Sequence, residues 1–416
     1  MRKIKRILLV VLIALSFLCF AGCTKKDDDG NKGNQAEKSV TVTFNVYDID
    51  GELLGSKEIK KDESFEGKKD GAAFQLLVDN FDVQYTESEY GPYITSINKS
   101  VSDANYYLAL YENGAMSMVG INDIEVNDGD VYDFKVETWS TSKTANDLLI
   151  DKMVYSFMKK DLTKVFTDSY DYSLLQAIVK ANKSFYDANL FDLNKIPNIS
   201  NYKAQWTADQ TGASLGNLFK ASLGCVDFDL ANDTIAPALN ALNNKEELEI
   251  IWSIAYYLDA CYNANVDNET YQAVLADFAS ILETSDPSDS VNMALAFYAL
   301  FSSDENFEQN VKTILDKQTS CLGEDGFVDA WMGANSCSTA QLIIALVATG
   351  QDPTTYYGVD LVNILLRYQH DGLFNYQLSD AEADLAFSTP QCYAALLMYK
   401  LYRDAGNKAV SFFDVK

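Results

Sequence analysis

The sequence predicts an α+β multidomain protein, in which a small β-rich domain with one helix precedes an α/α toroid made of helical-hairpin repeats. Three observations predict it. Between about Ser39 and Ser140 apolar residues recur at every second position. After Lys143 they recur at spacings of three and four. The last third of the chain contains two copies of one pattern, fifty residues apart.

The alternating part predicts short strands joined by tight turns. Val40, Val42, Phe44 and Val46 alternate with polar residues, and such a period of two is typical of a half-buried strand. Further strands are expected over Tyr106–Tyr111 and Val131–Val136, next to turns rich in Asn, Asp and Gly, residues that adopt the positive φ of hairpin turns. The segment Ala72–Val78 predicts the one helix of a domain that we place at residues 39–140.

The second part, residues 143–416, predicts stacked helices. Eight segments have helical spacing, and several are apolar on nearly every side, which indicates helices buried among others: Tyr170–Val179, Leu248–Leu258, Tyr271–Ile281, Val291–Phe301, Val311–Leu315, Thr339–Val347, Val359–Leu366 and Pro390–Leu401. A glycine-containing turn precedes a helix start at both Gln341 and Gln391, so one helical hairpin repeats every fifty residues. Such hairpins stack as an open solenoid or a closed ring, and small residues at the helix starts favour the ring.

The N-terminus predicts export and lipid attachment. A basic start, the apolar run Ile7–Phe20 and the small pair before Cys23 together form a signal peptide (residues 1–22) with a lipobox. Residues 23–38 would be the lipidated cysteine and a flexible polar linker. An ordinary signal peptide or a short membrane helix is the alternative. We therefore expect the chain on the extracytoplasmic face of the plasma membrane, lipid-anchored through Cys23.

Composition narrows the function. Removal of the signal takes away four basic residues, which changes the formal charge from −27 to about −31, and such acidity opposes nucleic-acid binding. The remaining cysteines match no metal-binding spacing, so buried free thiols are expected, with a Cys321–Cys337 bridge as the alternative: Cys225, Cys261, Cys321, Cys337 and Cys392. With a single histidine and no GxSxG, HExxH or P-loop pattern, we expect no catalytic residues, no bound metal and no enzyme activity.

Two stretches carry a resemblance to known families. Tyr90–Ile97 (YGPYITSI), Tyr106–Leu110, Asn113-Gly114 and Asp128–Asp130 resemble the β-domain of the vitamin B12 carriers transcobalamin and intrinsic factor and of their bacterial DUF4430-type relatives. Ser338–Pro353 and Ser388–Tyr399 resemble the toroid of the prenyltransferase and terpene-cyclase superfamily, but the zinc-ligand set and the DxDD acid motif of those enzymes are absent. The carriers combine the same two domains in the opposite order.

The resemblance implies that a corrinoid lies between the two domains as a carried ligand, with no cofactor. A corrin has a broad apolar face with amides at its rim, so it suits large apolar side chains and neutral polar groups. The candidate ligand contacts are Tyr90, Tyr107, Met116, Met118, Trp331, Gln341, His370 and Gln391. Those of the β-domain come from the resemblance. On the toroid, the glutamines offer amides at equivalent helix starts, Trp331 is a large aromatic residue in a loop, and the imidazole of His370 is a good cobalt ligand. The structural alternatives are a sheet face for Tyr107 and the methionines, a plug or brace of the repeat turn for Trp331 and the glutamines, and a plain polar turn residue for His370.

Three functions are consistent with this sequence. The first is corrinoid capture (cobalamin or a precursor) and delivery to a membrane importer. The second is non-catalytic adhesion or a structural role at the cell surface, through a polymer or protein partner. The third is a toroid enzyme whose site has no recognised motif.

Overall fold

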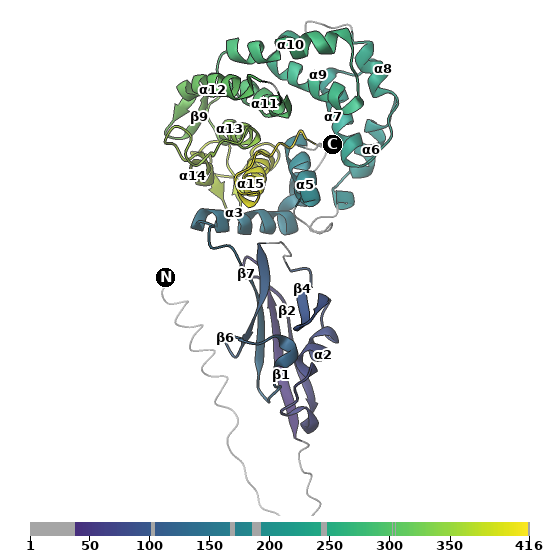
Figure 1. Cartoon of the computed structure of the whole chain (residues 1–416), viewed down its shortest axis with the longest axis vertical. Coiled ribbons are helices and arrows are strands. Elements are labelled where there is room, and N and C mark those ends of the chain that lie inside the picture. Colours follow the sequence, from purple (N-terminus) through teal and green to yellow (C-terminus); the bar gives the residue numbers. More distant parts are fainter. Residues whose placement is uncertain are drawn as a thin grey trace, which may run out of the picture.

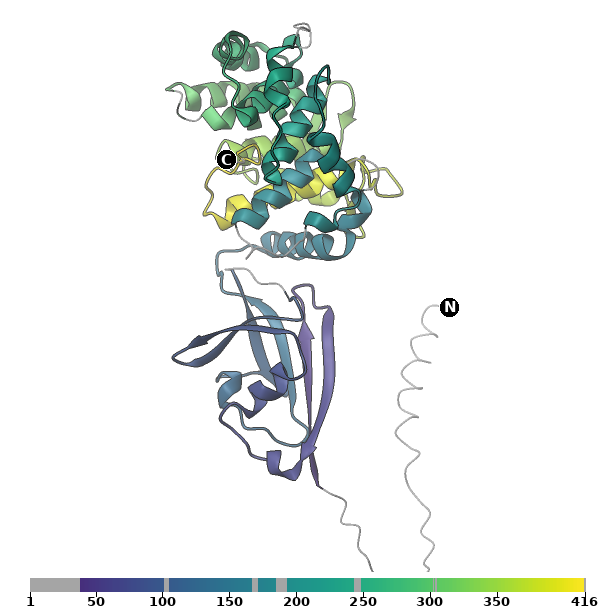
Figure 2. The same ribbon diagram turned by 90° about the vertical axis from the view of Figure 1, so that its right-hand side faces the viewer.

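The structure is a computed structural model that describes residues 38–100, 105–166, 171–184, 193–242, 248–301, 303 and 305–414. The predicted signal peptide, Cys23 and the linker as far as residue 37 lie outside these residues. The described chain is mixed α/β, with a small β-rich unit followed by a helical unit, and Figures 1 and 2 show the two units joined end to end. None of the described helices combines the length and the apolar character that crossing a membrane requires.

The β-rich unit contains a five-stranded sheet in the order β2-β1-β7-β5-β6. The β2–β1, β7–β5 and β5–β6 pairs are antiparallel, whereas β1 and β7 pair in parallel. The five strands are β1 (Ser39–Tyr47), β2 (Leu53–Asp62), β5 (Tyr106–Glu112), β6 (Ala115–Met116) and β7 (Val131–Thr138). A separate hairpin of β3 (Val83–Ser88) and β4 (Gly91–Ile97) accompanies the predicted helix, α2, which spans Ala72–Val78 as expected.

One face of this sheet forms the core of the β-rich unit. Val42, Phe44 and Val46 are at most 1% exposed, and the residues between them are half-exposed. Leu76 and Leu77 of α2 belong to the same apolar cluster. Full burial of such a side chain contributes about 1.5–3 kcal/mol, so the alternating pattern decides which face is covered. The opposite face of the sheet remains half-exposed.

The helical unit is built of paired helices. Helices α5, α7, α9, α11, α13 and α15 contact one another in sequence, and α15 also contacts α5, so their contacts form a closed cycle. Figure 1 shows the alternate helices outside this cycle. The longer helices of the unit are α3 (Ala145–Ser156), α5 (Tyr172–Ser184), α6 (Ile199–Trp206), α7 (Leu215–Asp227), α8 (Ile235–Asn240), α9 (Ile251–Ala264), α10 (Glu269–Thr284), α11 (Asp289–Tyr298), α12 (Phe307–Gln318), α13 (Ser336–Ala348), α14 (Leu361–Arg367) and α15 (Ser388–Asp404).

The fifty-residue repeat has a physical basis at its two turns. The backbone N–H of Phe327 donates to Thr339 Oγ1 at 3.1 Å, and in the next repeat Phe374 N–H donates to Thr389 Oγ1, fifty residues after Thr339, at 3.1 Å. The turns lie in two short hairpins, β8–β9 (Leu322–Gly323 and Gly326–Asp329) and β11–β12 (Gln369–His370 and Leu373–Phe374). The threonine hydroxyls near the starts of α13 and α15 thus fix the hairpins that precede these two helices.

Candidate ligand-binding site

The half-exposed face of the β-rich sheet carries a group of aromatic side chains beside the helical unit. Tyr107 pairs with Glu137 and Tyr111 pairs with Met116, and directly paired residues share a face of a sheet. Tyr107, Tyr111 and Met116 therefore lie together on the face opposite the core. The ring of Tyr107 stacks on Trp139, with 3.9 Å between centroids and 26° between planes. We call Tyr107, Tyr111, Met116 and Trp139 the aromatic platform.

The platform presents a flat apolar surface with a polar edge. Trp139 is 57% exposed and Met116 is 49% exposed, so both can contact a bound molecule. Tyr111 donates its hydroxyl to Glu137 Oε1 at 3.1 Å, and burial together with this carboxylate raises the pKa of Tyr111. The phenol therefore stays neutral at physiological pH. Stacked rings and a flexible thioether suit a broad apolar ligand face.

The other residues that the resemblance assigned to the β-domain lie apart from the stacked pair. Met118 follows β6 and is 94% exposed. Tyr90 lies in the turn of the β3–β4 hairpin and is 85% exposed. That hairpin contributes Val83 and Ile94 to the core cluster, so it covers the face of the sheet opposite the platform. Tyr107 and Met116 thus lie on the same face of the sheet, and Tyr90 does not.

A second apolar surface, the loop patch, lies where α13 and α15 begin. Its exposed members are Val328, Trp331, Met332, Leu378, Leu385 and Phe387, and Trp331 is 93% exposed. Ser336 joins the two loops, since its hydroxyl donates to Asn375 O at 2.7 Å and its N–H donates to Tyr376 O at 3.0 Å. Two consecutive repeat turns therefore present one apolar surface.

Two acidic side chains near the loop patch accept hydrogen bonds from it and from the start of α13. Asp329 is buried and accepts hydrogen bonds from the N–H groups of Trp331 (2.9 Å) and Met332 (3.1 Å). Asp289, in the first turn of α11, accepts from Ser338 Oγ at 2.7 Å. Burial raises the pKa of Asp289 to about 6. The loop that carries Trp331 is therefore held in place by its hydrogen bonds to the buried carboxylate of Asp329.

The two predicted glutamines lie in the first two turns of α13 and α15, which begin at Ser336 and Ser388. Gln391 donates to Phe387 O at 3.2 Å, and this bond braces the turn before α15. Gln341 is half-buried in the second turn of α13. The bond made by Gln391 is the one expected of the structural alternative, although it leaves the amide oxygen available to a ligand.

His370 lies in the β11–β12 hairpin, and its imidazole is 53% exposed. The nearest charged partner is Asp371, whose Oδ2 lies 3.8 Å from His370 Nδ1. Within the described ranges no group of three or more His, Cys, Asp or Glu side chains is arranged to hold a metal ion. A ligand that brought its own cobalt could still reach this exposed ring.

The cysteines of the helical unit are free thiols. The alternative of a Cys321–Cys337 disulfide is wrong for this structure. Cys337 is buried in α13, where it is close enough to Cys392 for the neighbouring thiol to affect its pKa. Cys321 is half-exposed, in a short 3-10 turn before β8. Cys321 thus precedes the β8–β9 hairpin, and Cys337 follows it in the first turn of α13.

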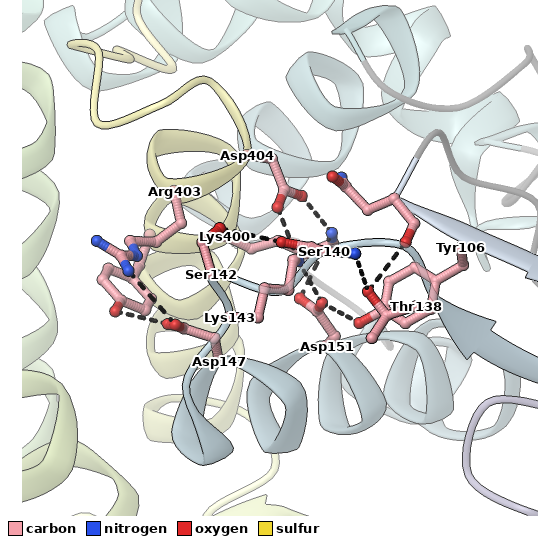
Figure 3. A network of polar contacts seen from close by, with 12 residues as sticks. Tyr106, Thr138, Ser140, Ser142, Lys143, Asp147, Asp151, Lys400, Arg403 and Asp404 are labelled. Carbon is pink, nitrogen blue, oxygen red and sulfur yellow. Dashed lines mark hydrogen bonds and ion pairs between the residues drawn. The ribbon is translucent and has the colours of Figure 1, made fainter.

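A buried network of charges connects the two units, and sequence reasoning did not predict it. Figure 3 shows Lys143 and Lys400 between the carboxylates of Asp151 and Asp404. Lys143 Nζ lies 2.5 Å from Asp151 Oδ2 and 2.7 Å from Asp404 Oδ1. Lys400 pairs with Asp404, and its Nζ lies 3.4 Å from Asp151 Oδ1. From β5, Tyr106 donates its hydroxyl to Asp151.

These five residues, which we call the junction network, are almost completely removed from water. The side chains of Lys400 and Asp404 are 0% exposed, those of Asp151 and Lys143 are 2% and 7% exposed, and Tyr106 is buried as well. The space that the network encloses with α3 and α15 is too small to hold a bound molecule. Its two cations and two anions balance, and this balance makes the burial of four charges tolerable.

A second set of ion pairs joins the units at the turn after β1. Lys159 Nζ lies 2.5 Å from Asp48 Oδ2 and also donates to Lys99 O at 2.9 Å. Lys160 pairs with Asp50 at 2.8 Å and with Glu52 at 2.6 Å. Both lysines lie on a π-helical turn, Phe157–Asp161, that follows α3. The units are therefore fixed to each other at two separate points.

Comparison with known proteins bears on the β-rich unit. Residues 70–138 match DUF4430, a domain of unknown function. This match confirms the predicted DUF4430 domain and includes Tyr107, Tyr111 and Met116 of the platform. A search of curated proteins found no match. A crystal structure from Ruminococcus gnavus, described as a candidate metal-binding protein, is similar over 24% of this chain and 99% of its own, with 16% identity and a TM-score of 0.20. That score supports no conclusion about fold or ligand.

Proposed function

We propose that the protein is an extracytoplasmic lipoprotein that binds a corrinoid where its two domains meet and passes it to a membrane importer, without catalysing a reaction. The helical unit would then be an α/α toroid of the kind that the vitamin B12 carriers combine with their β-domain. The closed cycle of inner-helix contacts and the DUF4430 segment support this proposal. The residues expected to contact the ligand include Tyr107, Met116 and Trp139.

The observation that carries the proposal is the stacked pair of Tyr107 and Trp139 beside the domain junction. Their rings are nearly parallel, and Trp139 is more than half exposed. A corrin ring presents an apolar face much larger than a single side chain, and an extended aromatic surface is the natural contact for it. The charges of the junction network are buried and paired with one another. The charged neighbours of the platform are Glu137, which accepts from Tyr111, and Lys135, whose Nζ lies 4.4 Å from the centre of the Tyr111 ring, so the stacked pair of Tyr107 and Trp139 is its most apolar part.

The direction of β1 is consistent with a lipid anchor that precedes the β-rich unit. Ser39 begins the strand, and Asp48, just after its end, pairs with Lys159 of the helical unit. At about 3.3 Å per residue, nine residues place the chain entry about 30 Å from the junction. An anchor at Cys23 would thus hold the helical unit away from the membrane. The aromatic platform would then lie between the membrane and the helical unit.

Calorimetric titration with cobalamin and cobinamide tests this proposal. The chain without residues 1–22, with Cys23→Ser to keep it in solution, should bind at least one of the two. Tyr107→Ala and Trp139→Ala should each weaken binding by about 1–3 kcal/mol, which is about 5- to 150-fold in Kd. Tyr93→Ala is the matched control, since Tyr93 is 47% exposed on the hairpin that covers the other face, and it should leave Kd unchanged.

The cobalt absorption bands test the role of His370 separately. Because His370 lies in an exposed turn, we expect His370→Ala to leave the spectrum of a bound corrinoid unchanged. If the intact chain gives no heat, no spectral change and no co-elution with any corrinoid, capture is wrong.

The loop patch favours adhesion as the second candidate function. Trp331 and Met332 project from the unit that would lie farthest from the membrane, and they are 93% and 55% exposed. Adhesion predicts that Trp331→Ser with Met332→Ser abolishes attachment of cells to their surface partner and leaves corrinoid titrations without heat before and after the change. Capture predicts the reverse: corrinoid binding that Tyr107→Ala weakens, and attachment that neither Tyr107→Ala nor the Trp331→Ser and Met332→Ser double change affects.

A further inference from the structure

An open pocket of about 340 Å³ lies in the helical unit between the C-terminal ends of α7 and α9. The segment 229–236, which leads into α8, closes one side of it. Figure 1 shows α7, α8 and α9 on the part of the helical unit away from the β-rich unit. The volume is at the lower end of the range for small-molecule sites, about 300–1,000 Å³. This pocket is separate from the aromatic platform and from the loop patch.

Three polar side chains of the pocket wall donate hydrogen bonds within the protein. Ser222 donates its hydroxyl to Phe219 O at 2.8 Å, and the amide of Asn232 donates to Trp206 O. Asn263 donates its amide to Asp259 Oδ2 at 3.0 Å. The hydroxyl proton of Ser222 and one amide N–H each of Asn232 and Asn263 are therefore engaged within the protein.

Acceptors, in contrast, remain. Asn263 is 7% exposed, and its Oδ1 is buried without a hydrogen-bond partner. A buried acceptor left unsatisfied is unfavourable, and a donor from a ligand would satisfy it. Asp229 adds a carboxylate at the exposed rim. Lys, Arg and His are absent from the residues that line the pocket. The unpartnered oxygen of Asn263 and the carboxylate of Asp229 thus favour a cationic molecule that donates hydrogen bonds.

Both flanking helices direct their negative ends toward this space. Each ends in the same way, with a left-handed residue and a bond back to a cysteine carbonyl. Asp229 has φ 51°, and Leu230 N–H donates to Cys225 O at 2.8 Å. Asn265 has φ 54°, and Val266 N–H donates to Cys261 O at 2.8 Å. The C-terminus of a helix carries a partial negative charge that stabilises a nearby cation.

We infer that this pocket binds a small alkylammonium cation, of the class of aliphatic monoamines and diamines. The ammonium group would donate hydrogen bonds to the carboxylate of Asp229 and to the amide oxygen of Asn263. Aliphatic carbons would pack on Leu230, Ile235 and Ala236, which form the apolar part of the wall. The formal charge of −27 would concentrate such cations near the protein. This inference does not depend on corrinoid binding.

Titration of the whole chain from residue 24 with 1,4-diaminobutane and butylamine tests the pocket. Both amines should bind, and 1-butanol and butyrate, which lack the ammonium group, should not. Asp229→Asn should weaken amine binding about five- to tenfold, because the charge is lost while asparagine still adopts the positive φ at this position. Asp233→Asn, an equal loss of charge at an exposed residue outside the pocket, should have no effect.

A second variant tests whether the amine binds inside this pocket, because a larger side chain there would exclude it. Ala236→Leu narrows the apolar wall and should reduce amine affinity at least tenfold, with an unchanged circular dichroism spectrum as evidence of folding. Three results would overturn the inference: no binding of either amine, equal weakening by Asp229→Asn and Asp233→Asn, or binding that Ala236→Leu leaves intact. Equal competition by Na⁺ or Ca²⁺ chlorides at the same ionic strength would also overturn it, because the site would then recognise charge alone.

Discussion

Replacement of Lys400 by methionine should destabilise the whole chain. Lys400 is 2% exposed and pairs with Asp404 and Asp151, which are themselves buried. The junction network contains two lysines and two aspartates, so the loss of one lysine leaves one uncompensated negative charge in an environment without water. Breaking a buried ion pair from one side costs about 3–5 kcal/mol. We expect the free energy of unfolding, measured in urea, to fall by that amount.

Two matched variants decide whether charge balance is the cause. Lys312 and Asp316 form an exposed pair on one helix, so Lys312→Met should change stability by less than about 0.5 kcal/mol. Lys400→Met together with Asp404→Leu restores neutrality, since Lys143 and Asp151 remain paired, and should cost less than the single change. A loss below about 1 kcal/mol for Lys400→Met, or a double variant worse than the single one, would refute this reasoning.

Three other predictions concern a buried acid, a glycine turn and the anchor. The stability contributed by the raised pKa of Asp289 is fully present below about pH 4 and is lost as the pH rises through about 6. Asp289→Asn should therefore raise the unfolding free energy by about 1 kcal/mol at pH 7.5 and by much less at pH 4.5. An equal effect at both pH values would contradict this. Gly326 has φ +103°, and an added Cβ would lie 2.2 Å from Thr339 Oγ1. Gly326→Ala should cost more than about 2 kcal/mol in thermal unfolding, and Gly358→Ala, at φ +80° with open space, about half that or less. Cys23→Ala should leave the chain without lipid and with its signal uncleaved, as intact-mass measurement of the membrane fraction would show; a lipidated product would disprove the lipobox.

Local patterns predicted the parts of the fold that local physics determines. The alternation from Val40 to Val46 predicted β1, and Ala72–Val78 was predicted as a helix with the bounds that the structure has. Helix starts were less accurate. The predicted Thr339–Val347 begins at Ser336 instead, because Asn335 caps the helix by accepting from Ser338 N–H at 2.8 Å. The β3–β4 hairpin was missed, since Tyr85 and its neighbours are mostly exposed and show no apolar alternation.

The sequence predicted a residue of the candidate site only where that residue could be recognised without knowledge of its neighbours in space. Tyr107 came from a family resemblance, whereas its stacking partner Trp139 was missed, because it lies just after β7 and thirty-two positions along the chain. The junction network was missed for a related reason. Lys143 and Asp404 are both charged, and charged residues are expected at the surface. Only the packing of α15 against α3 brings them together away from water.

Strand β5 places a residue of the junction network next to a residue of the aromatic platform. Successive residues of a strand point to opposite faces. Tyr106 points to the helical unit and donates to Asp151 in the junction network, and Tyr107, the next residue, points to the other face and stacks on Trp139. The same strand therefore attaches the β-rich unit and positions the platform. Because the ion pairs of Asp48 and Lys159 fix a second point, the platform is held in place before any ligand arrives. A surface fixed in this way loses little conformational entropy on binding, so capture would not need the two units to close on each other.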